Sequence, residues 1–129
     1  PIPPAPAAAA AFDEAALRQR LSGSEDLMTE VIRVFLEDLP VRLAAIKDAV
    51  DGRDAGALRT AAHALKGAAA NLSAGALCDA ASVLERVGAE SRMDAAEAAW
   101  RRLSVEAGHV MDVLRRYLSP PRESFPCAS

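Results

Sequence analysis

The sequence predicts an all-α protein: an antiparallel up-and-down four-helix bundle with a short additional helix before it. Alanine, the strongest helix former, is the commonest residue, whereas aromatic residues, which favour strands, make up only 4%. Seven of the eight prolines lie in the two ends of the chain, and Pro40 alone interrupts the span between them. We therefore expect a Pro/Ala-rich linker at 1–11, the bundle at 12–118 and a flexible C-terminal tail at 119–129.

Apolar residues recur every three or four positions in five stretches, which is the spacing of one helical face. The first stretch is short, from Phe12 to Leu21, and stops at a Ser-Gly pair. The four long stretches run from about 24 to 51, 54 to 72, 73 to 88 and 94 to 118. Because short loops join them, consecutive long helices are expected to pack antiparallel to each other.

Residues typical of helix N-caps stand at the start of each long stretch. They are Ser24, Asp54, Ser73 and Asp94, the last in an Asp-Ala-Ala-Glu sequence that is similar to a capping box. Pro40 is expected to bend its helix rather than end it, because the apolar spacing continues unchanged beyond it.

Length, charge and composition exclude several classes of protein. A chain of 129 residues is the size of one domain, too short for a multidomain enzyme. A net charge of −3 gives no broad cationic surface for nucleic acid. No charge-free apolar run approaches the length of a membrane span, and no secretory signal is recognisable. We expect a cytoplasmic protein without nucleic-acid binding or direct membrane contact, and the non-Met start suggests a domain of a longer chain.

The most informative segment surrounds His63. On a helical wheel with about 100° per residue, one arc holds the apolar residues of this stretch, and His63 lies about 160° from Leu65 at its centre. The apolar residues of the arc are Leu58, Ala62, Leu65, Ala69 and Leu72. His63 is therefore predicted to point away from the core.

The residues near His63 indicate an approach by another molecule. Gly67 follows one turn later, where glycine costs about 1 kcal/mol relative to alanine, and the missing side chain lets another surface come close to the imidazole. Ala64 and Ala70 keep the surroundings low, while Arg59 and Lys66 add positive charge suited to an anionic group.

An exposed imidazole can act as a nucleophile toward a phosphoryl group. With an unperturbed pKa of about 6.5, imidazole is mostly neutral at pH 7 and offers a ring nitrogen lone pair. Phosphoryl transfer depends mainly on positioning and charge neutralisation. The sequence has no GxxxxGK[ST] loop, no other glycine-rich nucleotide loop and no carboxylate cluster for Mg²⁺. The phosphoryl donor is therefore expected to bring the metal, and this domain to carry no cofactor.

The run AHALKGAAANLSAGAL at 62–77, with Leu-Glu at 84–85, closely resembles the histidine phosphotransfer (HPt) domains of bacterial multistep phosphorelays. The resemblance extends over roughly residues 12–118 and includes FLEDLP in the second helix. It implies that His63 is phosphorylated on the ring nitrogen farther from the backbone, that Lys66 helps to hold the phosphoryl oxygens, and that Gly67 permits docking of a receiver domain. Glu85 stands where the family carries a Glu or Gln close to the histidine.

The same resemblance implies further properties of the site and its partners. Arg59, Ala64 and Ala70 would contact the docked receiver, whose own site would hold Mg²⁺. Ala68 stands where many relatives have serine, which removes one hydrogen bond near the site. The chain is expected to be a monomeric covalent carrier rather than an enzyme with its own turnover. The Pro/Ala-rich start and the non-Met first residue suggest a hybrid sensor kinase as its parent, membrane-anchored or not, with this domain at the C-terminus. A free-standing carrier protein is the alternative.

Two alternatives remain open from the sequence. The bundle could be a docking or dimerisation module without chemistry, or the phosphoacceptor domain of a chemotaxis-type kinase that receives phosphate from an ATP-bound kinase domain. A metal site is not expected, because the two histidines, His63 and His109, lie on different helices without further ligands at suitable spacing.

Overall fold

The computed structural model describes residues 12–119, which form five α-helices and one short 3-10 helix. The elements are α2 (Glu14–Arg20), α3 (Glu25–Asp51), α4 (Ala55–Leu72), α5 (Gly75–Ala89), η1 (Met93–Ala95) and α6 (Ala96–Leu118). The predicted linker at 1–11 and all but the first residue of the predicted tail at 119–129 lie outside the described residues.

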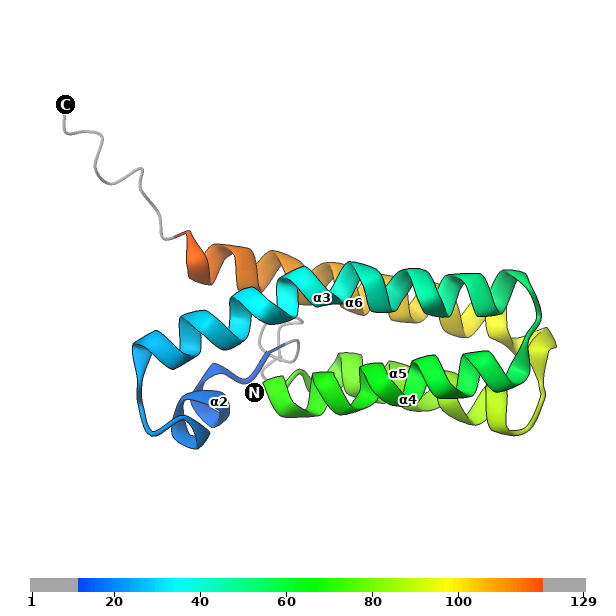
Figure 1. Ribbon diagram of the computed structural model, residues 1–129, viewed down its shortest axis with the longest axis horizontal. Helices are drawn as coiled ribbons and strands as arrows, with labels where there is room; N and C mark the ends of the chain where they lie inside the picture. Colours follow the sequence, from blue (N-terminus) through cyan, green and yellow to red (C-terminus); the bar gives the residue numbers. More distant parts are fainter. Residues whose placement is uncertain (1–11, 120–129) are drawn as a thin grey trace, which may run out of the picture.

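Helices α3 to α6 form the predicted four-helix bundle, and α2 covers one of its ends (Figure 1). Consecutive long helices run in opposite directions, joined by short connections at alternate ends of the bundle (Figure 1). Helix α3 continues through Pro40, and its first half is inclined to its second half in Figure 1. The predicted fold class is confirmed.

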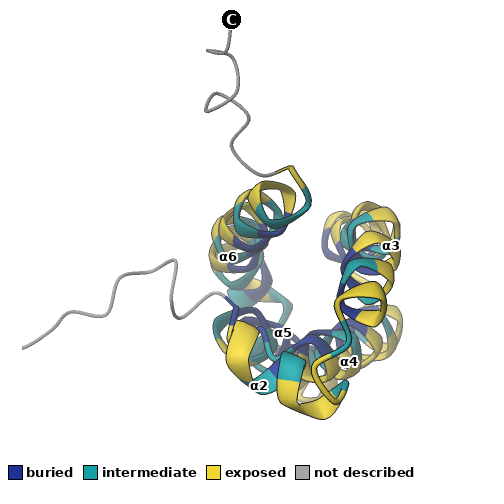
Figure 2. Ribbon diagram, turned by 90° about the vertical axis from the view of Figure 1, so that its left-hand side faces the viewer, coloured by how far each residue is buried: buried dark blue, intermediate teal, exposed yellow. Residues whose placement is uncertain are grey.

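Each long helix turns one apolar stripe toward the inside of the bundle, so that the buried residues line the inner surface (Figure 2). On α4 the buried residues are those of the predicted arc, Leu58, Ala62, Leu65, Ala69 and Leu72. Helices α4 and α5 share the most extensive contact of any helix pair. Both bury alanines, Ala62 and Ala69 on α4 and Ala80 and Ala81 on α5. Small side chains let these two helices approach closely.

Two of the four predicted N-caps are confirmed. The Ser24 hydroxyl accepts a hydrogen bond from the Leu27 amide at 3.2 Å, and the Asp54 carboxylate accepts one from the Ala57 amide at 3.0 Å. These bonds satisfy amide groups that have no partner within the first turn of a helix. Helices α3 and α4 therefore start where the sequence predicts.

The predicted caps at Ser73 and Asp94 are wrong. Ser73 ends α4 in a left-handed conformation with φ of 68°, and its carbonyl oxygen accepts a hydrogen bond from the Asp13 amide at 2.9 Å. The amides of Ser73 and Ala74 bond back to the carbonyl oxygens of Ala70 and Ala69, at 3.1 and 2.9 Å, which makes Ser73 a C-cap. Ala74 begins α5 without a side-chain cap. Asp94 lies inside η1, so α6 also begins without a side-chain cap.

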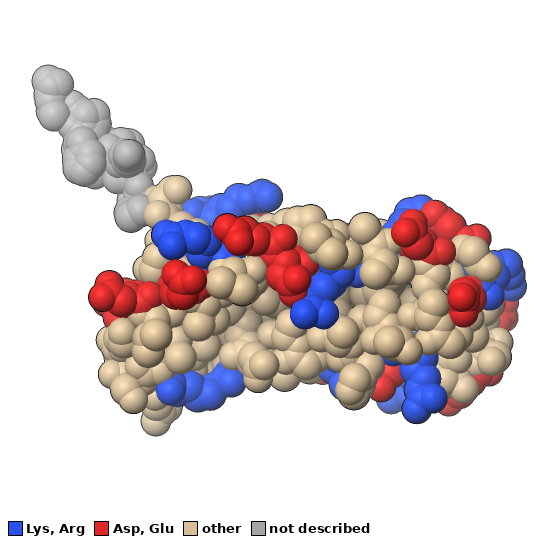
Figure 3. All heavy atoms as spheres, in the orientation of Figure 1, with Lys and Arg blue, Asp and Glu red and all other residues tan. Residues whose placement is uncertain are grey.

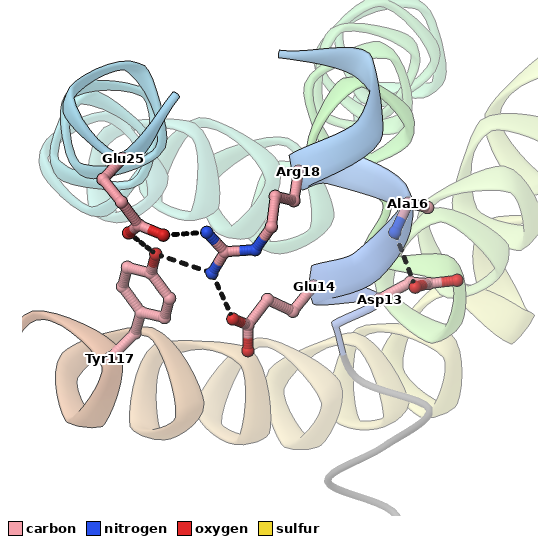
Figure 4. A network of polar contacts seen from close by, with 6 residues as sticks. All are labelled: Asp13, Glu14, Ala16, Arg18, Glu25 and Tyr117. Carbon is pink, nitrogen blue, oxygen red and sulfur yellow. Dashed lines mark hydrogen bonds and ion pairs between the residues drawn. The ribbon is translucent and has the colours of Figure 1, made fainter. Parts of the chain in front are cut away.

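A polar network fixes α2 to the end of the bundle (Figure 4). Arg18 pairs with Glu14 on its own helix at 2.6 Å and also with Glu25 of α3. The Tyr117 hydroxyl of α6 accepts a hydrogen bond from Arg18 at 3.2 Å and donates one to Glu25 at 2.8 Å. We call Glu14, Arg18, Glu25 and Tyr117 the end clamp, because they join α2, α3 and α6. Within residues 12–119, no helix has both the length and the apolar character needed to cross a bilayer.

Candidate functional site

His63 lies in the middle of α4 on the face opposite the buried arc, with 67% of its side chain exposed. Leu65 and Ala62, its neighbours on the buried arc, have no exposed surface. The periodicity of α4 therefore places the imidazole at the surface as the sequence predicts, on a helix whose packed side fixes its position.

Glu85 reaches His63 from the neighbouring helix. Its Oε2 lies 2.9 Å from Nδ1 of His63, and its Oε1 lies 2.6 Å from Nζ of Lys66. Lys66 follows His63 by about one turn on α4, while Glu85 stands on α5 with 20% of its side chain exposed. One carboxylate thus bridges the imidazole and the ammonium group, with one oxygen for each.

The contact with Glu85 assigns the tautomer of His63. An ionised carboxylate only accepts hydrogen bonds, so Nδ1 carries the ring proton and donates a hydrogen bond to Oε2. In the neutral ring, Nε2 then holds the lone pair. The nitrogen farther from the backbone is therefore the nucleophilic one, on a side chain open to solvent.

The same contacts keep Glu85 ionised. The hydrogen bond from Lys66 lowers the pKa of the Glu85 carboxyl, and the contact with His63 lowers it further, against the opposing effect of partial burial. Glu85 therefore remains an acceptor for Nδ1 throughout the neutral range.

The surroundings of His63 are low and partly hollow. Gly67 is exposed, and a Cβ added there would meet no atom within 4 Å. Ala64 and Ala70 are also exposed. Arg59 lines a hollow together with His63, Glu85, Gly56 and Thr60. The structure therefore gathers His63, Lys66, Glu85 and Arg59, while Ala70 lies almost two turns beyond His63.

Sequence reasoning gave no role to Gly56 or Thr60, although both line this hollow. Thr60 precedes His63 by three residues and Gly56 by seven, so both share its face of the helix. Helical spacing is the signal by which they could have been found.

The side of the bundle formed by α3 and α4 carries uncharged surface next to the site. Ala64 lines a hollow between the two helices with Val41 and Arg42. Val41 and Val34 of α3 are 67% and 51% exposed. Figure 3 views this side and shows uncharged atoms over much of its lower middle, with charged side chains at both ends, along the upper edge and reaching into the upper middle. This surface suits contact with a protein more than with a polyanion.

No group of three or more His, Cys, Asp or Glu side chains in residues 12–119 is arranged to hold a metal ion.

Comparison with known proteins gives two matches. The Hpt domain family model matches residues 30–118. The crystal structure of histidine-containing phosphotransfer protein B from Pseudomonas aeruginosa PAO1 is similar with a TM-score of 0.79 and 25% sequence identity, covering 87% of this chain and 97% of that chain. No curated protein sequence matches the chain.

Proposed function

Since the chain belongs to the Hpt domain family and acts as a histidine phosphotransfer intermediate of phosphorelays, we propose that His63 is the residue that carries the phosphoryl group. The observation that carries this proposal is the 2.9 Å contact between Nδ1 of His63 and Glu85, which makes Nε2 the nitrogen with the free lone pair on an exposed side chain. His109, the other histidine, has no comparable partner.

The phosphoryl group comes from an aspartyl phosphate of a receiver domain. Nε2 attacks the phosphorus, the N–P bond forms, and the P–O bond to the aspartate breaks, so that the aspartate leaves as a carboxylate. The ring gains positive charge as it bonds to phosphorus, and the Glu85 carboxylate on Nδ1–H stabilises that charge. Because both phosphorylated forms are reactive, the same steps run backward to a second receiver.

Lys66 neutralises negative charge on the phosphoryl oxygens. In the unphosphorylated protein its ammonium group is bound to Glu85 at 2.6 Å, which keeps it close to the ring. A phosphoryl group on Nε2 offers Lys66 a stronger anion, so we expect the ammonium group to turn from the carboxylate toward the phosphoryl oxygens. A Mg²⁺ ion held by the receiver would supply further charge neutralisation at the phosphoryl group.

A receiver domain docks over His63 and the low surface around Gly67. Its approach needs the exposed backbone at Gly67, and Arg59, Ala64 and Ala70 border the contact. The domain acts as a monomer in the cytoplasm, where receivers occur, and its parent is a hybrid sensor kinase.

Labelling with a phosphorylated receiver tests this function. The expected result is an acid-labile, alkali-stable label on the wild-type chain that the His63→Gln variant lacks and the His109→Gln variant retains. Equal labelling of the His63→Gln variant would contradict the proposal. A parallel incubation with ATP and an isolated chemotaxis-type kinase domain is expected to give no label, and labelling only in that arm would favour the kinase-acceptor alternative.

A further inference from the structure

At Gly88, helix α5 lies so close to the backbone of α4 that no side chain fits between them. A Cβ added to Gly88 would lie 2.7 Å from the carbonyl oxygen of Ala55 and 2.7 Å from the amide nitrogen of Arg59. Both are main-chain atoms of α4, so no side-chain rotation relieves the contact. No other glycine in residues 12–119 comes under 3.0 Å of a neighbour in this way.

The contact lies beside the site. Arg59 precedes His63 by about one turn on α4, and Gly88 follows Glu85 by about one turn on α5. Helices α4 and α5 are antiparallel (Figure 1). The Gly88 contact and the His63–Glu85 pair therefore occupy adjacent levels of this helix pair. Gly88 is fully packed inside this interface, whereas Gly67 on the outer face of α4 is exposed.

We propose that Gly88 is a positioning residue for phosphoryl transfer: its lack of a side chain sets the α4–α5 separation at which Glu85 holds Nδ1 of His63. This inference rests on the proposed role of His63. Gly88 does not touch the reacting atoms and acts only through the carboxylate.

The distances show why the separation matters. A Cβ contact under 3.0 Å requires a shift and ordinary contact begins at 3.4 Å, so an alanine at 88 moves the two helix backbones apart by about 0.3 to 0.7 Å from the 2.7 Å position. A shift of this size along the line between Oε2 of Glu85 and Nδ1 of His63 lengthens their 2.9 Å contact to about 3.2 to 3.6 Å, which weakens or breaks the hydrogen bond. Lys66 has a long flexible side chain that follows the carboxylate, but the imidazole ring on α4 has less reach.

The test compares Gly88→Ala with Gly75→Ala. Both glycines lie on α5, but a Cβ at Gly75 meets no atom within 4 Å. The measurements are the ¹⁵N chemical shifts of the His63 ring, which report the tautomer, and the rate of transfer from a phosphorylated receiver. Gly88→Ala is expected to increase the Nε2–H tautomer and slow transfer about tenfold, because weakening the contact that orients an imidazole has effects of that order. Gly75→Ala is expected to change neither.

A purely structural role for Gly88 gives a different result. If Gly88 acts through Glu85, then Gly88→Ala slows transfer no further in a Glu85→Ala background. Equal slowing in both backgrounds, or an unchanged tautomer in the Gly88→Ala variant, would overturn the proposal.

If Gly88→Ala does not fold, a second variant, Glu85→Asp, tests the same contact. Glu85→Asp shortens the reach of the carboxylate by one methylene without touching the helix contact, and it should reproduce the tautomer change and the slower transfer. An unchanged tautomer and rate would show that the helix separation is not limiting. Loss of label from His63→Gln together with these negative results would refute only the role of Gly88 and leave the proposed function intact.

Discussion

Two histidines lie on the surface of this bundle, each next to a glutamate, and only one has a partner that fixes its ring. Nδ1 of His63 lies 2.9 Å from Glu85 on the neighbouring helix, whereas Nδ1 of His109 lies 3.8 Å from Glu106, three residues earlier on the same helix. The second distance is too long for a hydrogen bond. Exposure does not separate the two, because 67% of one side chain and 46% of the other are accessible.

The difference shows what a histidine needs to become a nucleophile on a plain helical scaffold. A partner from a second, closely packed helix fixes the tautomer of His63 and binds Lys66 beside it, while the small residues on the outer face leave Nε2 accessible. A glutamate on the same helix provides none of this for His109. Each following variant changes one part of that arrangement at His63 and, where the chain offers one, the corresponding part at His109.

The largest effect on the transfer rate is expected from a bulky residue at Gly67, and the glycine next to His109 provides the control. Gly67→Leu blocks the approach of a receiver and is expected to slow transfer by about 100-fold or more. Gly108→Leu, next to His109 on α6, leaves transfer unchanged. Since neither added Cβ meets an atom within 4 Å, both variants should unfold with a free energy equal to or up to about 1 kcal/mol above wild type. Urea unfolding and transfer kinetics measure the two quantities, and equal transfer by both variants would remove Gly67 from the docking surface.

Removing the carboxylate beside His63 is expected to have the next largest effect on the transfer rate, with the carboxylate beside His109 as the control. Glu85→Ala releases Nδ1 and is expected to slow transfer about tenfold to 100-fold, the range typical of losing a group that orients an imidazole. Glu106→Ala is expected to have no effect. Transfer rates from one phosphorylated receiver compare the two variants, and equal rates would mean that the tautomer of His63 does not govern the reaction.

Lys66→Gln is expected to slow transfer about fivefold, since a partly exposed charge contributes up to about 1 kcal/mol. Arg86→Gln, which removes an exposed cation from α5, serves as the control with no expected change.

The Lys66→Gln variant is also expected to change the pH range in which Glu85 is ionised. Because the hydrogen bond from Lys66 is the largest cause of the lowered pKa of Glu85, Lys66→Gln raises that pKa toward its ordinary range. The stabilisation from the ionised carboxylate is present above the ordinary pKa of a glutamate and is lost as the pH falls through the lowered value, so the variant loses it at a higher pH. Carboxyl ¹³C titration measures this shift, and an unchanged titration of Glu85 would contradict the ion pair.

The smallest effect on transfer is expected at the end clamp. Tyr117→Phe removes the hydroxyl that joins Arg18 and Glu25, which should lower the free energy of unfolding by about 0.5 to 1.5 kcal/mol. The transfer rate should stay at the wild-type value, because the clamp ties α2 to the bundle end and shares no residue with the site. Slower transfer in a fully folded Tyr117→Phe protein would show that α2 acts on the site.

The helices and the exposure of His63 can be predicted from the sequence, because each depends on the apolar spacing within a single helix. The period of α4 separates Leu65 from His63 without knowledge of any other element. Gly67 and Lys66 were predictable for the same reason, since their spacing from His63 places them next to it on the same helix.

Features that depend on how two helices pack against each other are harder to predict from the sequence. Glu85 could be related to His63 only by resemblance, because their contact depends on how α4 and α5 are aligned. Gly88 ends the apolar stretch at 73–88, and its contact with the α4 backbone depends on the helix separation, which no single helix defines. Ser73 stands between two helices, where serine is compatible with either cap, and main-chain bonds back to Ala69 and Ala70 make it the C-cap of α4. The end clamp joins residues up to 99 positions apart, and no local pattern indicates it.

The most direct test of the central claim is to locate the phosphoryl group by ¹⁵N and ³¹P NMR on the chain labelled by a phosphorylated receiver. The account predicts one phosphorylated nitrogen, Nε2 of His63, with Nδ1 still protonated and bound to Glu85. A phosphoryl group on Nδ1 of His63, or on either nitrogen of His109, would contradict it.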